Sequence, residues 1–366
     1  MNIVLTFSII AILCTILNST GVWKYGLLIG FIITTSLLAI HYDYGNDYMA
    51  YLDWFESSST MHLPNSFSEF QELSRAPGWD LLNLLFFKLF GGNGFFAMVA
   101  FISIIEGICY YTFIKTNVPV KWYWLAMATY ILNVNFFMLS FSMMRQSLVM
   151  AILLVCFIWI QHKKIILPLL VMVLLSTIHQ SILICIPLVL ISYNNILSQK
   201  KWSVFLFGCW SLFLLMSSIL EPIIQQFTIT TQLFTEYLET YAEQNDISYG
   251  LGYILALFPF FIILFLLFNN KIAKEHMFLI ITWSTSIILI PFCSVAPLIE
   301  RIIIYFELTT IAIYPAILTY IKSPYLRISL LFIFLLLFCF SFYQNFYNPD
   351  SVYYQSYLKF TTIFHL

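Results

Sequence analysis

Ten apolar runs of helix-spanning length constrain this chain more than any other feature of its sequence. They lie at about 2–18, 23–40, 94–114, 122–140, 145–161, 203–220, 250–268, 276–293, 301–320 and 325–345. A helix that crosses a bilayer needs about 20 apolar residues. Only 9% of the 366 residues are charged, whereas a soluble domain carries about 25% charged residues. We therefore predict an all-α polytopic membrane protein that forms a single membrane domain over residues 1–366.

A further apolar stretch, at 165–192, is long for one span and short for two. The lysines favour two short helices that meet near His179. With two helices, lysine-rich loops alternate with acidic loops along the chain, and ten of the twelve lysines fall on one side. The positive-inside rule assigns that side to the cytoplasm. The prediction is therefore about 12 transmembrane helices, within a range of about 10–14, with both termini outside.

Two of the predicted outer loops are long, at about 41–93 and 221–249. The first contains a Pro-Gly turn at 77–78, followed by an apolar piece at 81–90. This piece is too short to cross a bilayer, so we expect a re-entrant or interfacial helix. The second loop has glutamates at helical spacing, which is typical of an amphipathic helix on a surface. These are Glu236, Glu239 and Glu243.

Three of the four arginines fall on the predicted outer side, against the usual bias: Arg75, Arg145 and Arg301. The planar guanidinium group suits phosphate and stays charged when it is partly desolvated. These arginines are therefore candidates for binding an anion, or else they anchor helix ends at the membrane surface. His179 would lie below the outer surface in a cavity lined by protein, or else it is a hydrogen-bonded core residue.

Carboxylates and aromatic side chains alternate at the start of the first outer loop: Asp43, Asp47, Tyr48, Tyr51 and Trp54. A sugar site needs both kinds of residue. Aromatic rings stack on the apolar faces of pyranoses, while carboxylates hold hydroxyl groups or act as a general base. The alternative is a solvated loop whose aromatic residues lie at the membrane interface.

The net charge, the cysteines and the remaining histidine and acidic residues limit the possible functions and cofactors. The net charge of −1 argues against a nucleic-acid binder, and the seven cysteines lie in apolar runs without metal-binding spacing. His41 with Asp43 and Asp47 also lacks a diagnostic spacing, so we predict no metal and no other cofactor. Glu106 and Glu307 lie inside apolar runs, where an acid is either functional or neutral and hydrogen-bonded to a neighbouring helix.

Several short motifs together resemble those of the EpsG family, the Wzy-like polymerases of exopolysaccharide, capsule and O-antigen assembly. The most specific is Arg145-Gln146-Ser147-Leu148, followed about thirty residues later by His179-Gln180-Ser181. The remaining matches are Asp47-x-x-x-Tyr51, Pro77-Gly78-Trp79 and Arg301 with Tyr305. The family often has an acidic residue just before the Pro-Gly pair. This chain has Ala76 there, with Glu72 and Asp80 as the nearby acids.

The resemblance implies a GT-C-like glycosyltransferase of the bacterial cytoplasmic membrane, with an active site that faces the exterior or periplasm. It would join oligosaccharide repeat units carried on undecaprenyl diphosphate, with inversion at the anomeric carbon and without a metal. A chain-length regulator and a flippase are expected partners. A polysaccharide flippase and a membrane O-acyltransferase of glycans are the alternative functions.

Under this hypothesis the candidate site residues have three roles. Arg145, Arg301 and Arg75 bind the diphosphate of the donor and stabilise charge on it as it leaves. The general base is His179, Asp47 or Asp43. The sugars contact Tyr48, Tyr51, Trp54, Gln146 and Ser181.

Overall fold

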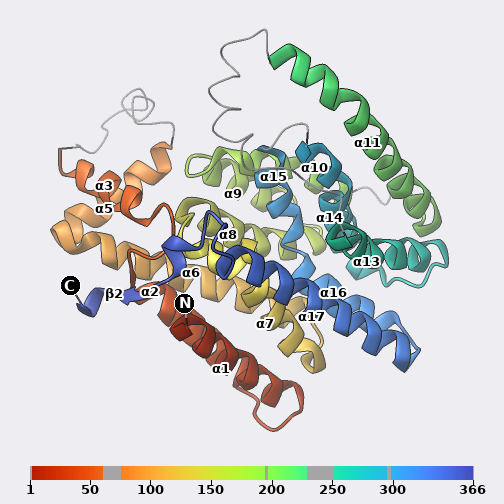
Figure 1. Ribbon diagram of the computed structural model, residues 1–366, viewed down its shortest axis with the longest axis horizontal. Coiled ribbons are helices and arrows are strands. Elements are labelled where there is room, and N and C mark those ends of the chain that lie inside the picture. Colours follow the sequence, from red (N-terminus) through yellow and green to blue (C-terminus); the bar gives the residue numbers. More distant parts are fainter. Residues whose placement is uncertain (1, 61–75, 194–196, 229–250, 295–297, 366) are drawn as a thin grey trace. The chain divides into compact units, whose positions relative to one another are not determined.

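The computed structural model describes residues 2–60, 76–193, 197–228, 251–294 and 298–365, and the structure is 83% helical (Figure 1). Five of the described helical segments are long and apolar enough to cross a membrane. The number is seven if each of two bent helix pairs counts as one span. The protein is thus an all-α membrane protein, as predicted. The count of about 12 spans and the GT-C-like arrangement remain predictions.

Contacts group the chain into two compact units. Unit 1 comprises Met1–Val189 and Phe338–Leu366, and unit 2 comprises Leu190–Leu337. The expectation of a single membrane domain remains a prediction. Arg75 and most of the predicted outer loop at 221–249 lie outside the residues that the structure describes.

Unit 1 is built around α8 (Met144–Gln161). Against it packs α6 (Gly94–Asn117), which in turn packs against α2 (Gly26–Ile40). α1 (Asn2–Ser19) packs against both α2 and α7 (Tyr123–Leu132). The buried share of residues is 72% in α8 but only 28% in α1. α8 is therefore largely enclosed by protein.

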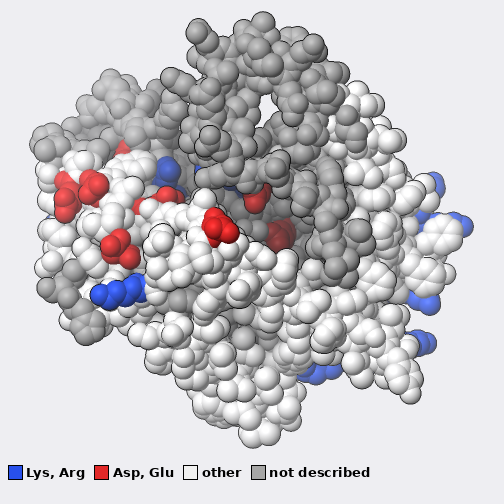
Figure 2. Space-filling model, in the orientation of Figure 1, with Lys and Arg blue, Asp and Glu red and all other residues white. Residues whose placement is uncertain are grey.

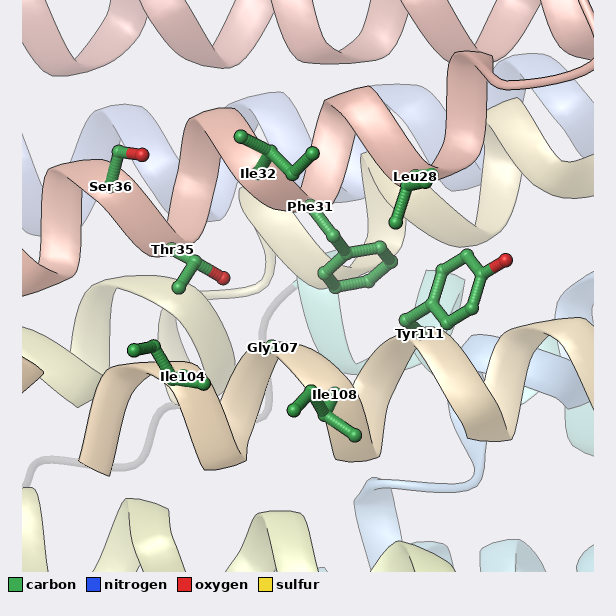
Figure 3. A pocket seen from close by; sticks show the side chains of 9 residues that line it. All are labelled: Leu28, Phe31, Ile32, Thr35, Ser36, Ile104, Gly107, Ile108 and Tyr111. Atoms are coloured by element: carbon green, nitrogen blue, oxygen red, sulfur yellow. The ribbon is translucent and has the colours of Figure 1, made fainter. Parts of the chain in front are cut away.

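A groove lies between α2 and α6, where the two helices approach each other closely (Figure 3). A Cβ at Gly107 would overlap the hydroxyl group of Thr35, so the glycine permits this close approach. The groove has a volume of about 260 Å³ and an almost entirely apolar lining. Ile32 and Ile108 in this lining are 54% and 59% exposed. Small residues at a close helix contact are typical of packing in membranes.

The stretch at 165–192 forms two short helices with a break near His179, as the sequence predicts. α9 (Ile166–Ser176) is followed by a turn, and a 3-10 helix at Gln180–Cys185 leads into α10 (Ile186–Tyr193). The backbone of His179 is extended, with φ −147° and ψ 105°, and this conformation interrupts the helix. His179 therefore lies at a turn between two apolar helices.

The predicted first outer loop at 41–93, whose outer side remains a prediction, contains the short helix α5 (Pro77–Phe90). Proline suits the first position of a helix because its missing N–H would have no partner there. The helix ends at Gly91, whose φ of 64° lies in the left-handed region that favours glycine. A Cβ at Gly94 would overlap the carbonyl group of Phe86, so the chain turns sharply between α5 and α6. The placement of α5 at the membrane surface remains a prediction.

The C-terminal segment returns to the first outer loop. β1 (His41–Tyr42) pairs antiparallel with β2 (Thr361–Thr362). The hydroxyl group of Tyr357 donates to the carbonyl oxygen of Met138 at 3.0 Å, and its ring contacts that of Tyr44 at 4.9 Å. These contacts fix the part of the loop that leads to Asp43 and Asp47.

Two of the predicted apolar runs are bent and not continuous. The run at 122–140 bends by 50° at Asn133, and the run at 301–320 bends by 51° after Glu307. The side chain of Asn133 accepts a hydrogen bond from the backbone N–H of Asn135 at 2.9 Å. Such a local bond competes with the helical hydrogen bonds, which explains the first bend.

Unit 2 contains five described helices: α11 (Gln199–Thr228), α13 (Leu251–Phe268), α14 (Met277–Leu289), α15 (Leu298–Glu307) and α16 (Thr310–Tyr320). Both α13 and α14 pack against α11, and α15 packs against α14. A last helix, α17 (Pro324–Phe346), continues from unit 2 into unit 1.

Candidate active site

Arg145 lies in the first turn of α8, against two aromatic rings of the first outer loop. Both rings belong to α3 (Tyr48–Ser57). The guanidinium carbon of Arg145 is 4.8 Å from the ring centre of Trp54 and 5.8 Å from that of Tyr51. A cation over an aromatic face is attracted by the ring electrons, more strongly when it is partly desolvated. The dipole of α8 adds positive potential at the same place, so this end of the helix is suited to an anion.

Both rings that face Arg145 also contact α5. The indole N–H of Trp54 donates to a carboxylate oxygen of Asp80 at 2.8 Å. The neighbouring Trp79 is fully buried and packs on the ring of Tyr51, with 5.4 Å between the ring centres. α5 therefore supports both rings that face Arg145.

Asp47 is half-buried and lies immediately before α3. Its backbone N–H donates to the hydroxyl group of Ser142 at 3.1 Å, which ties the loop to the segment just before Arg145. Tyr51 follows Asp47 by one helical turn, so Asp47 and the ring that faces Arg145 lie on the same side of α3. Asp43 is exposed, and its φ is 46°.

Tyr48 and Tyr51 are both enclosed by protein. The side chain of Tyr48 is fully buried, and its hydroxyl group donates to the backbone of His41 at 3.1 Å. Tyr51 is 8% exposed, and its hydroxyl group accepts from the Arg145 Nε–H at 3.5 Å. Burial raises the pKa of Tyr51, whereas the nearby Arg145 lowers it. The phenol is neutral at neutral pH, so its hydroxyl group can donate as well as accept hydrogen bonds.

His179 is half-buried, and its Nδ1 lies 2.7 Å from the hydroxyl oxygen of Ser181. The turn that carries it packs on α5, because the backbone N–H of Gly78 donates to the carbonyl oxygen of Thr177 at 2.9 Å. Ile178 packs against the buried cluster that contains Tyr51 and Trp79. The structure thus brings the His179 turn, the Pro-Gly-Trp turn and α3 into one compact unit with Arg145.

A model of the EpsG family matches residues 24–362, which is nearly the whole chain. The chain belongs to the EpsG family. This confirms the resemblance that its motifs showed. The family is one of glycosyltransferase-like polymerases of exopolysaccharide synthesis, and such polymerases use lipid-linked oligosaccharides. No curated protein and no solved structure matches the chain.

In this EpsG-family protein neither of the other two candidate arginines, Arg301 and Arg75, lies in the part of unit 1 that the structure describes. Arg301 lies on α15 of unit 2, half-buried and one turn before the fully buried Tyr305. Arg75 lies outside the described residues. Of the three, Arg145 is the one that lies against the aromatic rings of α3.

Two buried acids lie next to the family motifs. The sequence left Glu106 open between a functional acid and one hydrogen-bonded to a neighbouring helix, and it named Asp80 only as an acid near the Pro-Gly pair. Glu106 on α6 is 1% exposed, and it accepts a hydrogen bond from the hydroxyl group of Ser147 at 2.6 Å. Ser147 belongs to the Arg-Gln-Ser motif, so Glu106 connects α6 to the first turn of α8. Asp80 supports Trp54 in the way described above. A sequence signal for Asp80 exists, because an acid in the first turn of a helix is favoured by the helix dipole.

The exposed face of the first outer loop is acidic. Asp43, Asp53 and Glu56 are exposed there. Figure 2 shows acidic side chains gathered over the part of unit 1 that holds α3 and α5. Asp53 and Glu56 lie on α3, the helix whose Tyr51 and Trp54 rings contact Arg145. This combination offers sites for both an anion and the hydroxyl groups of a sugar.

Proposed function

We propose that this protein joins oligosaccharide repeat units carried on undecaprenyl diphosphate into a surface polysaccharide. The reaction takes place on the outer face of the bacterial cytoplasmic membrane. Family membership supports a polymerase of exopolysaccharide synthesis. The observation that carries the site assignment is the position of Arg145, in the first turn of α8 and against the rings of Tyr51 and Trp54.

Arg145 binds the diphosphate of the donor in this proposal. Phosphate oxygens accept hydrogen bonds from the guanidinium fork, and the N-terminus of α8 adds favourable potential. The same contacts stabilise the charge that develops on the diphosphate as the glycosidic bond breaks. Arg301 and Arg75 are further candidates for this role.

His179 takes the proton from the acceptor hydroxyl group. Nδ1 of the ring lies 2.7 Å from the hydroxyl oxygen of Ser181, which orients the imidazole, and Nε2 is the ring atom that takes the proton in this proposal. The acceptor oxygen then attacks the anomeric carbon while the bond to the diphosphate breaks, so a single displacement inverts that carbon. Asp47 is the alternative base, with the exposed Asp43 beside it. Trp54, Tyr51 and Ser181 are candidates for sugar contacts, whereas the burial of Tyr48 and Gln146 favours a supporting role for both.

The decisive experiment uses purified protein in liposomes with lipid-linked repeat units and no other protein. We expect the natural sequence to produce longer lipid-linked glycan. Arg145→Ala should lower kcat/KM by at least about 100-fold, because a charged hydrogen-bonding partner of the diphosphate is lost. Lys88→Ala removes an exposed cation on α5 and should leave the rate unchanged.

Three outcomes would contradict the proposal. Long glycan from a folded Arg145→Ala protein would remove Arg145 from the site. Transfer of lipid-linked glycan across the bilayer without elongation would identify a flippase. Acylation of the glycan without elongation would identify an O-acyltransferase.

The pH dependence of the same reaction separates the two candidate bases. A base must be deprotonated to work, so a histidine base gives a rate that falls as the pH drops through the near-neutral range. A carboxylate base gives a rate that falls only near pH 4. We expect the near-neutral fall, and we expect it to disappear in His179→Asn.

A further inference from the structure

Asp80 carries a buried carboxylate that the proposed reaction does not use. Its side chain is 1% exposed and lies in the first turn of α5. A buried carboxylate is costly unless hydrogen bonds satisfy it. One of these bonds comes from the indole N–H of Trp54, at 2.8 Å.

This hydrogen bond restricts the orientation of Trp54. The indole has a single N–H, which lies at the edge of the ring. A bond at that edge fixes the rotation of the ring about the side-chain axis. The ring face is then presented to Arg145, whose guanidinium carbon is 4.8 Å from its centre.

The first turn of α5 supports the second ring as well. Trp79 precedes Asp80 and packs on Tyr51, at 5.4 Å between ring centres. The position of α5 is itself fixed by the hydrogen bond from Gly78 to Thr177. Asp80 and Trp79, both in the first turn of α5, therefore hold the two rings that contact Arg145.

We infer that Asp80 is a positioning residue for Arg145, acting through the indole of Trp54. The inference rests on the proposed function, in which Arg145 binds the diphosphate of the lipid-linked donor. Asp80 does not touch the diphosphate. It holds the ring against which the guanidinium group is oriented, so it affects donor binding through Trp54 and Arg145.

The test measures kcat and the KM for the lipid-diphosphate donor in liposomes. Asp80→Leu removes the acceptor of the hydrogen bond, and Trp54→Phe removes its donor. Each should raise the donor KM about tenfold, which corresponds to about 1.4 kcal/mol. A smaller fall in kcat is expected, because Arg145 also stabilises the leaving diphosphate. The double variant should show about the same tenfold effect, because the two residues act as one unit.

Asp80→Asn provides the rescue. The amide oxygen still accepts from the indole, so the donor KM should return close to that of the natural sequence. Asp350→Leu and Trp23→Phe are matched controls that make the same types of change at exposed positions. Gel filtration and thermal unfolding establish that every variant is folded.

Two results would overturn the inference while the proposed function stands. One is an unchanged donor KM in folded Asp80→Leu. The other is a double variant in which the two single effects multiply to about 100-fold, because independent residues add in free energy. If the natural sequence neither extends glycan nor binds inorganic diphosphate, the proposed function fails and this inference fails with it.

Discussion

The backbone N–H of Gly78 donates to the carbonyl oxygen of Thr177 at 2.9 Å, and this bond joins two family motifs that are far apart in the sequence. The contact is close enough that a Cβ at Gly78 would overlap the hydroxyl group of Thr177. The Pro-Gly-Trp turn and the turn that carries His179 are therefore held together through a glycine that has no side chain to separate them.

Gly78→Ala should displace the His179 turn from α5. Overpacking at a close backbone contact costs about 1–3 kcal/mol, so we expect a lower melting temperature and a lower polymerisation rate. Gly92→Ala is the matched control, because nothing lies within 4 Å of a Cβ at that position. Equal melting temperatures and equal polymerisation rates in the two variants would show that the close contact at Gly78 does not position the His179 turn.

The C-terminal segment should be needed to fix the loop that carries Asp47. Deletion of residues 350–366 removes β2, Tyr357 and the ring of Phe360, which contacts Tyr44 at 5.1 Å. We expect faster amide hydrogen exchange at residues 41–48 and loss of activity, with the helices of unit 1 still folded. Unchanged exchange in this loop would contradict the prediction. Tyr357→Phe should have a smaller effect of about 1 kcal/mol on stability, because it removes only the hydroxyl group that donates to Met138 and keeps the ring.

His41 should make the protein less stable in mild acid. Burial lowers its pKa from 6.5 to about 4, because the charged ring is poorly solvated. The folded protein therefore binds fewer protons than the unfolded chain between these two values, and stability falls as the pH drops through that range. The loss reaches about 3 kcal/mol at the acid end of the range.

His41→Phe keeps the ring contacts with Tyr48 and Phe141 but cannot bind a proton. Its melting temperature should depend less on pH between 6.5 and 4 than that of the natural sequence. His162→Phe changes an exposed histidine and should retain the full dependence. The same slope in all three proteins would show that His41 is not the group responsible.

Glu106 should stabilise the protein through its hydrogen bond to Ser147. Glu106→Gln keeps an acceptor at the same place and should be tolerated. Glu106→Leu leaves the Ser147 hydroxyl group without this partner and should cost about 1–3 kcal/mol. Thermal unfolding in detergent measures the difference, with the exposed Thr112→Val on the same helix as control. A Leu variant as stable as the Gln variant would contradict this role.

The positions of the helices were predicted well from the sequence. Helices occur at every one of the ten apolar runs, and the break near His179 lies where the lysine pattern placed it. The bend at Asn133 was not predicted, because a hydropathy pattern does not detect one side-chain hydrogen bond to the backbone. The number of membrane spans, the side of the membrane that each loop faces and the roles of the arginines remain predictions.

The candidate site was predicted in part. Arg145, Asp47, Tyr51, Trp54 and His179 were named from the sequence, and the structure places them all in unit 1. The sequence suggested Trp54 as a sugar platform, whereas the structure places Arg145 over its ring. Arg301 lies in unit 2, and its role in binding the diphosphate remains a prediction.

The sequence by itself determined the class of protein, the positions of its helices and its membership of the EpsG family. These depend on local hydropathy, on segment length and on short motifs, which are properties of neighbouring residues. Only the tertiary structure showed that Asp80 supports Trp54 and that the C-terminal segment holds the loop of Asp47. Contacts of this kind join residues far apart in the chain, and they arise from helix packing and not from any pattern along the sequence.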